Sequence, residues 1–302
     1  MGSILVTGAS GQLGQCLAEN SIGSDLSLKF HDRMALDLSD IRSIRQAFAN
    51  DEYDGVINAG AYTAVDRAEL EPEKAWAVNA IAPALLAAEC KDRSIPLIHV
   101  STDYVYSGTK DGVYQETDPI GPVSTYGASK AAGELAVMAS GARAVITRTS
   151  WVVSPFGSNF VKTMLKLGKE RDELRVVADQ KGAPTSALDL ATALLSVMDR
   201  LIADPSAPTG AYHVTNSGET TWYGVAETIF EIASLMGQKT PCLVPITTAD
   251  YPTPARRPAN SRLSGESLLA DYGLQLPHWK ASLESVVRRL IEAQTGRERI
   301  EQ

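Results

Sequence analysis

The sequence is short of the residues that most often bind metals or form disulfides. Its 302 residues include only three cysteines, Cys16, Cys90 and Cys242, and four histidines, His31, His99, His213 and His278. The odd, sparse set of cysteines lacks metal-ligand spacing and indicates reduced thiols that pack as small buried apolar residues. His99 and His213 stand among apolar residues of expected strands, which favours a structural role. No metal site is predicted.

Long apolar runs and an excess of positive charge are also missing. No stretch approaches the roughly 20 apolar residues of a membrane-spanning helix, and the N-terminus leads into a strand without the basic and apolar regions of a signal peptide. The net charge of −8 offers no general attraction to nucleic acid or anionic membranes. We therefore expect a cytoplasmic protein with neither a membrane nor a nucleic acid as its partner.

The first half of the chain alternates short apolar runs with helical patterns, which is typical of a parallel α/β sheet. The apolar runs predict strands at residues 3–6, 26–31, 54–58, 97–101 and 144–147. The helical patterns between them cover residues 12–19, 41–49, 72–91 and 125–138. The predicted fold class is therefore α/β, with a Rossmann-type doubly wound parallel sheet.

Beyond Arg148 this rhythm loosens. Helices are predicted at residues 159–167, 186–201, 221–236 and 282–293, strands at 174–177 and 211–214, a proline-rich extended connection at 241–258 and a polar tail at 295–302. We expect two units with the site in the cleft between them. The larger unit would comprise residues 1–150 and 186–218, and a smaller α/β substrate-binding unit would comprise residues 151–185 and 219–302.

A glycine-rich turn follows the first predicted strand, with its glycines spaced G-x-x-G-x-x-G. Such a turn needs glycine where the backbone dihedral angles are unusual and where a phosphate must approach the backbone closely. The helix that follows offers free N–H groups and the positive end of its dipole. The turn predicts a dinucleotide site formed by Gly8, Gly11, Gln12, Leu13 and Gly14.

The end of the second predicted strand faces the adenosine ribose in such folds. Asp32 would accept hydrogen bonds from free ribose hydroxyls, whereas Arg33 would neutralise a 2′-phosphate. The two signals conflict, so the choice between NADPH and NADH stays open. Asp37 and Leu38, just beyond, are predicted to contact the adenine.

A tyrosine and a lysine, Tyr126 and Lys130, share one face of a predicted helix. Reduction of a carbonyl needs a proton donor at the oxygen while hydride arrives at the carbon, and Tyr126 would be that donor. The Lys130 ammonium would lower the pKa of the tyrosine from about 10 and could hold the nicotinamide ribose. Thr102, at the carboxyl end of a predicted strand, would fix the carbonyl oxygen. These three residues predict hydride-transfer chemistry.

At these residues the chain resembles the extended short-chain dehydrogenase/reductase superfamily and, within it, the dTDP-4-dehydrorhamnose reductases. The matching segments run nearly end to end, at residues 58–69, 101–106, 148–151, 159–164, 179–185 and 257–261. The glycine turn and the catalytic residues are common to the superfamily, whereas the loop after the third strand, Trp151 and the segment 257–261 are more specific. Two departures are small: residues 106–108 stand where the family often has Phe-Asp-Gly, and residues 59–61 where it often has three alanines.

The resemblance implies a substrate and a set of site residues. NADPH or NADH would deliver hydride to carbon 4 of dTDP-4-dehydro-L-rhamnose. Thr102 and Asp103 would orient the sugar, and Trp151 would offer it an apolar face. The cofactor would also be lined by Ala61, Tyr62 and Thr63. Arg257 or its neighbour Arg256 would hold the nucleotide diphosphate, because a guanidinium matches phosphate oxygens bidentately. Some relatives respond to magnesium, but the sequence identifies no ligands for it.

Other functions stay open at this point. A reductase of another nucleotide sugar and an epimerase would use the same residues. A sugar 4,6-dehydratase is disfavoured, because those enzymes have a glutamate where Tyr104 follows Asp103. The non-catalytic regulatory subunit of methionine adenosyltransferase also resembles this family, although the intact set of Thr102, Tyr126 and Lys130 favours turnover. The final helix would either cover the core or mediate a homodimer.

Overall fold

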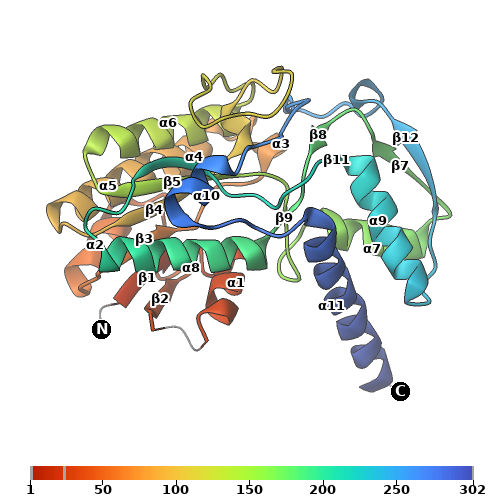
Figure 1. Ribbon diagram of the computed structural model, residues 1–302, viewed down its shortest axis with the longest axis horizontal. Helices are drawn as coiled ribbons and strands as arrows, with labels where there is room; N and C mark the ends of the chain where they lie inside the picture. The colour runs from red at the N-terminus through yellow and green to blue at the C-terminus, as the bar shows by residue number, and fades with distance from the viewer. Residues whose placement is uncertain (1–2, 23–24, 301–302) are drawn as a thin grey trace.

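The computed structural model describes residues 3–22 and 25–300, and its centre is a six-stranded sheet (Figure 1). The strands are β1 (Ser3–Thr7), β2 (Ser27–His31), β3 (Gly55–Asn58), β4 (Leu97–Thr102), β5 (Ala144–Thr149) and β10 (Gly210–His213). Their spatial order is β10-β5-β4-β3-β1-β2, and every neighbouring pair is parallel. The order reverses between β1 and β3, which confirms the predicted Rossmann-type, doubly wound sheet.

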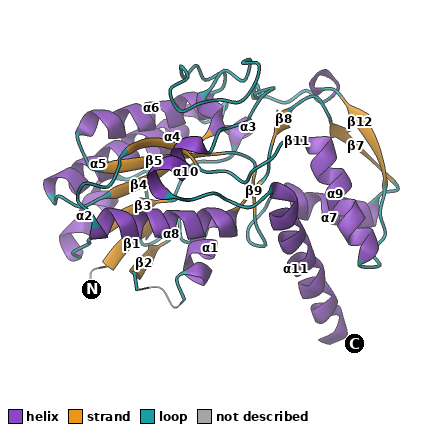
Figure 2. Ribbon diagram, viewed as in Figure 1, coloured by secondary structure: helices purple, strands orange, loops and turns teal. Residues whose placement is uncertain are grey.

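Helices cover both faces of this sheet, as Figure 2 shows, and the strands are apolar on both faces for that reason. The covering helices are α1 (Gln12–Asn20), α2 (Ile41–Asn50), α5 (Ala82–Asp92), α6 (Thr125–Ser140) and α8 (Ala187–Ala203). Ile4 and Val6 of β1 belong to a core formed with α1 and α8. Leu5 belongs to a core on the opposite face, formed with α2, α5 and α6. The alternation follows the two-residue period of a strand.

The helix predicted at residues 72–91 contains one π-helical turn. It begins as α4 (Pro72–Trp76), widens at Ala77–Ile81 and continues as α5. The wide turn places the buried Asn79 against α6, where a Cβ atom on Gly133 would clash with the Asn79 carbonyl oxygen. Such turns are frequent at functional sites, and this one brings a buried amide to the helix that carries the predicted catalytic pair.

A second core lies beside the sheet, on the right of Figure 1. Its elements are α7 (Phe160–Glu170), β7 (Glu173–Val177), α9 (Trp222–Leu235), β12 (Cys242–Ile246) and α11 (Trp279–Ile300). Two short strand pairs accompany it: β6 (Val152–Val153) with β9 (Thr185–Ser186), and β8 (Lys181–Gly182) with β11 (Thr220–Thr221). Leu283, Val287 and Ile291 of α11 are buried in this core, so the final helix covers it.

The remaining helices are short. They are α3 (Val65–Ala68), 3-10 turns at Asp103–Val105 and Thr248–Asp250, and α10 (Glu266–Tyr272). The sequence does not predict α10, and its Leu268 packs, together with Leu276, in the core that α8 shares with the sheet. Among the residues described, no helix is long and apolar enough to cross a bilayer.

Three expectations for the C-terminal half are wrong. The proline-rich stretch 241–258 is not an extended connection throughout, because β12 forms within it and pairs with β7; Pro245 is tolerated there at a sheet edge. Cys242, at the start of this edge strand, is exposed rather than buried. The last helix begins at Trp279 instead of residue 282 and includes part of the predicted polar tail, since α11 runs to Ile300. Residues 301 and 302 of that tail lie outside the described residues.

Replacing Gly133 by alanine tests how closely α6 approaches the π-helical turn. The added Cβ would meet a backbone oxygen, so the packing must shift. We expect the free energy of unfolding to fall by about 1–3 kcal/mol, measured by urea denaturation followed by circular dichroism. Gly121→Ala is the matched control, because its Cβ would come no closer than 3.9 Å to Ser107. Equal unfolding midpoints for the two variants would contradict the close approach.

Candidate active site

The turn after β1 meets the loop after β3 with backbone against backbone. Gly8 has a φ of +70°, in the region that favours glycine, and a Cβ on it would lie 2.6 Å from Gly60 Cα. A Cβ on Gly14 would clash with Gly8 O, so α1 also packs directly on the turn. Leu38 borders the same place, because a Cβ on Gly60 would lie 2.6 Å from its Cδ1. These contacts lie where the strand order reverses between β1 and β3, at the switch point whose crevice binds nucleotides in doubly wound sheets.

The N-terminus of α1 suits the pyrophosphate of a dinucleotide. Gly11 precedes the helix and supplies no side-chain cap. By contrast, the helices α6, α7, α8 and α9 begin with capping side chains: Ser124, Asn159, Ser186 and Thr221. Uncapped N–H groups and the positive end of the dipole favour an anion there. Gln12 accepts a hydrogen bond from Asn159 Nδ2 at 2.9 Å and Leu13 is buried, so the backbone of both residues fits a cofactor better than their side chains do.

At the end of β2, Asp32 is engaged in its own turn. Its Oδ1 accepts hydrogen bonds from the N–H groups of Met34 and Ala35, at 2.9 and 3.0 Å. The Arg33 side chain is 80% exposed, with its Nε 3.7 Å from Asp37 Oδ2. One oxygen of Asp32 thus serves its own turn, while the Arg33 side chain is exposed at the same strand end.

The loop that carries the predicted cofactor residues Ala61, Tyr62 and Thr63 is fixed by Asn79, which the sequence reasoning missed. Asn79 Oδ1 accepts a hydrogen bond from Tyr62 N at 2.8 Å, and its Nδ2 donates to Tyr62 O at 3.1 Å. The same Nδ2 donates to Ser129 Oγ in α6 at 3.0 Å. The buried amide thus joins the cofactor loop to α6. Its only signal in the sequence was one amide within a largely apolar helix.

Tyr126 lies in the first turn of α6, whose start is fixed by a hydrogen bond from Gly127 N to Ser124 Oγ at 3.1 Å. The buried Tyr126 side chain lies close to Thr102 at the carboxyl end of β4, so two predicted catalytic residues meet. Burial raises the pKa of Tyr126 above its ordinary value of 10.0; the Thr102 hydroxyl opposes this rise and the charge of Asp103 adds to it. A tyrosine with a raised pKa holds its proton at neutral pH, as a proton donor must.

Lys130 lies one helical turn further along α6 and reaches the backbone of β4. Its Nζ donates a hydrogen bond to Val100 O at 2.6 Å. Burial lowers the pKa of Lys130 to about 8, and the charge of Glu134 opposes this fall. The net pKa of Tyr126 nevertheless lies above its ordinary value, because the burial of the tyrosine outweighs the groups that favour its phenolate.

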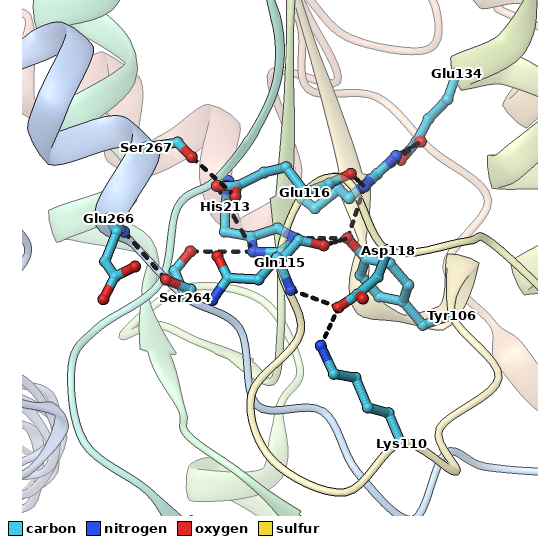
Figure 3. Close-up of polar contacts among 11 residues, drawn as sticks. Tyr106, Lys110, Gln115, Glu116, Asp118, Glu134, His213, Ser264, Glu266 and Ser267 are labelled. Atoms are coloured by element: carbon cyan, nitrogen blue, oxygen red, sulfur yellow. Dashed lines mark hydrogen bonds and ion pairs between the residues drawn. The ribbon is translucent and has the colours of Figure 1, made fainter.

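Further along α6, a buried ion pair ties this helix to the sheet. Arg148 of β5 donates hydrogen bonds to both carboxylate oxygens of Glu134, at 2.7–3.1 Å, and to Tyr106 Oη at 2.6 Å. Tyr106 Oη also lies 2.7 Å from His213 Nε2, and Figure 3 shows this pair gathered with Glu116. Burial lowers the pKa of His213 to about 4, so this histidine is neutral at pH 7. The sequence patterns did not reveal this cluster.

Asp103 is buried beside Thr102. Thr102 Oγ1 donates a hydrogen bond to Asp103 Oδ1 at 3.0 Å, and the side chain of Ser261 lies near the same carboxyl group. Burial nevertheless raises the pKa of Asp103 to about 6. The contact with Ser261 joins the end of β4 to a segment far along the chain.

That segment, residues 255–264, bridges the sheet and the second core, and we call it the strap. Asn260 N donates a hydrogen bond to Gly108 O at 3.0 Å, in the loop after β4. Ser261 N donates to Lys181 O of β8 at 2.7 Å. The strap thus lies between the two regions and beside Asp103.

Arg257 lies in the strap and is already paired. Its Nη2 is 2.6 Å from Asp66 Oδ2, and its Nη1 donates to Tyr104 Oη at 3.5 Å. Arg256 beside it is exposed. Arg257 would therefore have to leave Asp66 in order to bind a diphosphate with its full guanidinium group.

Trp151 is held in one orientation at the border of the second core. Its φ of +50° is one that non-glycine residues rarely adopt. The ring stacks on Trp222 with centroids 3.9 Å apart and planes at 17°, and a Cβ on Gly182 would lie 2.8 Å from Trp151 Cε2. Strained backbone of this kind concentrates at ligand sites.

These residues fit a dinucleotide. The switch-point crevice is bordered by the crowded glycine turn, the uncapped start of α1 and the loop fixed by Asn79. Asn79 also joins this loop to α6, the helix from which Tyr126 reaches Thr102. Magnesium is a different matter. Among the side chains that the structure describes, no three histidine, cysteine, aspartate or glutamate residues form a group that could hold a metal ion, so we assign no magnesium ligands.

The fold and the grouping of Thr102, Tyr126 and Lys130 define an NAD(P)-binding protein of the extended short-chain dehydrogenase/reductase class. The model of the RmlD substrate binding domain family matches residues 2–292. Curated proteins named dTDP-4-dehydrorhamnose reductase are 42% identical in Burkholderia thailandensis and 40% identical in Sinorhizobium fredii, over 95% of this chain and at least 97% of each relative. The chain therefore belongs to the dTDP-4-dehydrorhamnose reductase family.

Solved structures agree with this assignment. A dTDP-4-dehydrorhamnose reductase from Clostridium acetobutylicum is 36% identical with a TM-score of 0.89, over 95% of this chain and 99% of its own. One from Bacillus anthracis, in complex with NADP, is 35% identical with a TM-score of 0.88 and the same coverage. UDP-glucose 4-epimerase from Thermus thermophilus, at 22% identity and a TM-score of 0.75 over 95% of this chain and 99% of its own, shares the fold. The resemblance inferred from the sequence is confirmed.

Asp103→Asn should make the protein more stable at neutral pH. The folded-state pKa of about 6 exceeds the ordinary 3.8, so the folded protein binds the proton more tightly and its stability falls as pH rises from about 4 to about 6. Since one pKa unit corresponds to ~1.4 kcal/mol, the penalty reaches about 3 kcal/mol. Urea unfolding at about pH 4.5 and about pH 7.5 measures it.

The asparagine variant should gain about 2 kcal/mol more stability over the parent at the higher pH than at the lower pH. Asp111→Asn, at an exposed position, is the matched control. The same difference between Asp103→Asn and the parent at both pH values would show that the carboxyl group does not titrate as described.

Proposed function

We propose that this protein reduces the 4-keto group of dTDP-4-dehydro-L-rhamnose to give dTDP-L-rhamnose, a precursor of cell-surface polysaccharide, with NADPH or NADH as the cofactor. The observation that carries the proposal is that Tyr126 and Thr102, both buried, lie close together on elements that border the dinucleotide crevice. The names of relatives at 40–42% identity support the substrate.

The reduced nicotinamide supplies a hydride to the carbonyl carbon when it is bound. Tyr126 would donate its phenolic proton to the carbonyl oxygen, and its raised pKa keeps that proton in place until negative charge develops there. Thr102 would hold the same oxygen through its hydroxyl group. The Lys130 ammonium, which Glu134 helps to keep charged, would stabilise the phenolate left on Tyr126.

The sugar nucleotide would bind between the sheet and the second core. Asp103 Oδ2 is buried without a hydrogen-bond partner among the described residues, and a sugar hydroxyl would satisfy it. Trp151 would offer its indole to the apolar methyl group of the 6-deoxy sugar. The exposed Arg256 would hold the diphosphate, and Arg257 would contact it with the part of its guanidinium group that does not face Asp66.

This assignment divides the chain into two working units. Residues 1–150 and 186–218 would bind the cofactor, and residues 151–185 and 219–302 would bind the nucleotide sugar. The separate apolar cores support the division, although Leu268 packs with the first unit. The protein would act in the cytoplasm, where an exposed thiol such as that of Cys242 stays reduced.

Tyr126→Phe should lose most of the reaction while keeping the cofactor. Loss of the proton donor should lower kcat by about 100-fold to 10,000-fold, whereas the dissociation constant of NADPH should stay within about twofold. The measurement is loss of nicotinamide absorbance, with dTDP-4-dehydro-L-rhamnose generated in the cuvette by its upstream enzymes. Parent activity in a folded Tyr126→Phe variant would remove Tyr126 from the proton-donor role. No NADPH oxidation by the parent would refute the reductase function.

Arg33→Ala tests how the cofactor is chosen. If Arg33 turns toward the 2′-phosphate, its loss removes a charge-assisted contact of ~1.5–3 kcal/mol, so NADPH should bind at least about tenfold more weakly. NADH lacks that phosphate, and its affinity should change by less than about twofold. Fluorescence titration with each cofactor measures both values, and Arg45→Ala on α2 is the exposed control. An equal loss for both cofactors would place Arg33 outside the 2′-phosphate site.

A further inference from the structure

The ring of Tyr126 packs against α3, the single helical turn that follows the cofactor loop. Tyr126 forms a small apolar cluster with Ala68 of α3 and Ala75 of α4, and Val65 and Tyr104 lie at its edge. Ala68 and Ala75 are fully buried. The position of α3 therefore fixes one side of the aromatic ring of Tyr126.

Directly after α3, Glu69 holds the start of α6. Its Oε1 accepts a hydrogen bond from Thr125 N at 2.8 Å, and its Oε2 accepts one from Thr125 Oγ1 at 2.6 Å. This N–H is one of those in the first turn of α6 that have no partner within the helix. A carboxylate at this position also interacts favourably with the positive end of the helix dipole. Because Thr125 immediately precedes Tyr126, Glu69 fixes the backbone from which the tyrosine extends.

At the other end of α3, Asp66 holds the strap. Its Oδ2 pairs with Arg257 Nη2 at 2.6 Å, and its Oδ1 accepts a hydrogen bond from Ala255 N at 3.2 Å. Arg257 also bonds to Tyr104 Oη, and the Tyr104 ring meets the Tyr126 ring edge to face, with centroids 5.5 Å apart and planes at 74°. Tyr126 is thus enclosed by a closed ring of contacts through Glu69, α3, Asp66, the strap and Tyr104.

We propose that Asp66 and Glu69 are positioning residues that together hold Tyr126 in register with Thr102 and the substrate carbonyl; this inference rests on the proposed reductase function. Both acids act through other groups: Glu69 through the backbone of α6, and Asp66 through Arg257 and Tyr104. Because these contacts close through the strap, the tyrosine is held from both sides while Arg257 is paired with Asp66.

A role in stability alone predicts a different result. Asp66 is 40% exposed in its ion pair, and partly exposed pairs contribute only ~0–1 kcal/mol to stability. A misplacement of about 1 Å at reacting groups can cost about 100-fold in rate. Neutralising these acids should therefore lower kcat far more than the free energy of unfolding.

The test compares Glu69→Gln, Asp66→Asn and the double variant with the parent. Each single change should lower kcat by about tenfold or more, while the dissociation constant of NADPH stays within about twofold. Since both acids belong to one ring of contacts, the double variant should lose less than the product of the two single losses. Glu73→Gln, an exposed acid at the start of α4, is the control and should keep the parent kcat.

Thr125 supplies a conservative pair of variants for the same contact. Thr125→Val removes the hydroxyl that donates to Glu69 and should lower kcat in the manner of Glu69→Gln. Thr125→Ser keeps the hydroxyl and should retain the parent kcat. Hydrogen exchange at the amides of residues 125–127 measures the contact without catalysis, and it should be faster in Glu69→Gln.

Each outcome decides the proposal. Parent kcat and parent hydrogen exchange in Glu69→Gln would overturn it, as would losses that multiply fully in the double variant. If the parent oxidises no NADPH with the sugar nucleotide, the reductase function fails on its own account. Hydrogen exchange then decides whether Glu69 holds the start of α6: faster exchange supports the positioning contact, and unchanged exchange overturns it.

Discussion

The approach of one backbone to another at Gly8 and Gly60 is the constraint from which the site follows. No Cβ fits between them, so the turn after β1 and the loop after β3 form one crevice where the order of the sheet reverses. The loop that leaves Gly60 then reaches Tyr62, whose N–H and carbonyl are both bonded by Asn79. Since Asn79 also bonds α6, the cofactor crevice and the catalytic helix are placed by one chain of contacts.

Buried charge is distributed unevenly around this helix. Removing a charged side chain from water costs several kcal/mol, so stability alone does not favour Lys130, Glu134 and Arg148 in the interior. Here each cation lies next to the Glu134 carboxylate, which Arg148 bonds directly and whose charge favours the protonated form of Lys130. Asp103 is buried instead beside neutral hydroxyl groups, and its burial raises its pKa. The buried cations Lys130 and Arg148 thus have an anionic partner in Glu134. The Asp103 carboxylate beside Thr102 has no cationic partner of this kind, and hydroxyl groups of a sugar would bind there.

The parts of the fold that the sequence predicts are those with a local signal. Apolar runs bounded by turns marked the strands of the sheet, and the four-residue spacing of Tyr126 and Lys130 on α6 placed both on one helix face. Contacts between distant segments had no such signal. Arg257 lies 191 residues from Asp66, and its side chain suits a phosphate as well as a carboxylate, so only the fold selects the partner. The same holds for Asn79, whose side-chain amide can form hydrogen bonds with any neighbouring backbone group.

The second core and the strap differ in how far their ligand-binding groups are preorganised. Trp151 is strained at φ +50° and stacked on Trp222, and such strain persists only where the surrounding structure maintains it. The aromatic surface is therefore preformed. Arg257 is paired with Asp66 through Nη2, so only the rest of its guanidinium group is left for a diphosphate. A nucleotide sugar would meet the rigid indole without rearrangement, whereas its diphosphate would act on the strap, and through Tyr104 on the ring of contacts around the proton donor.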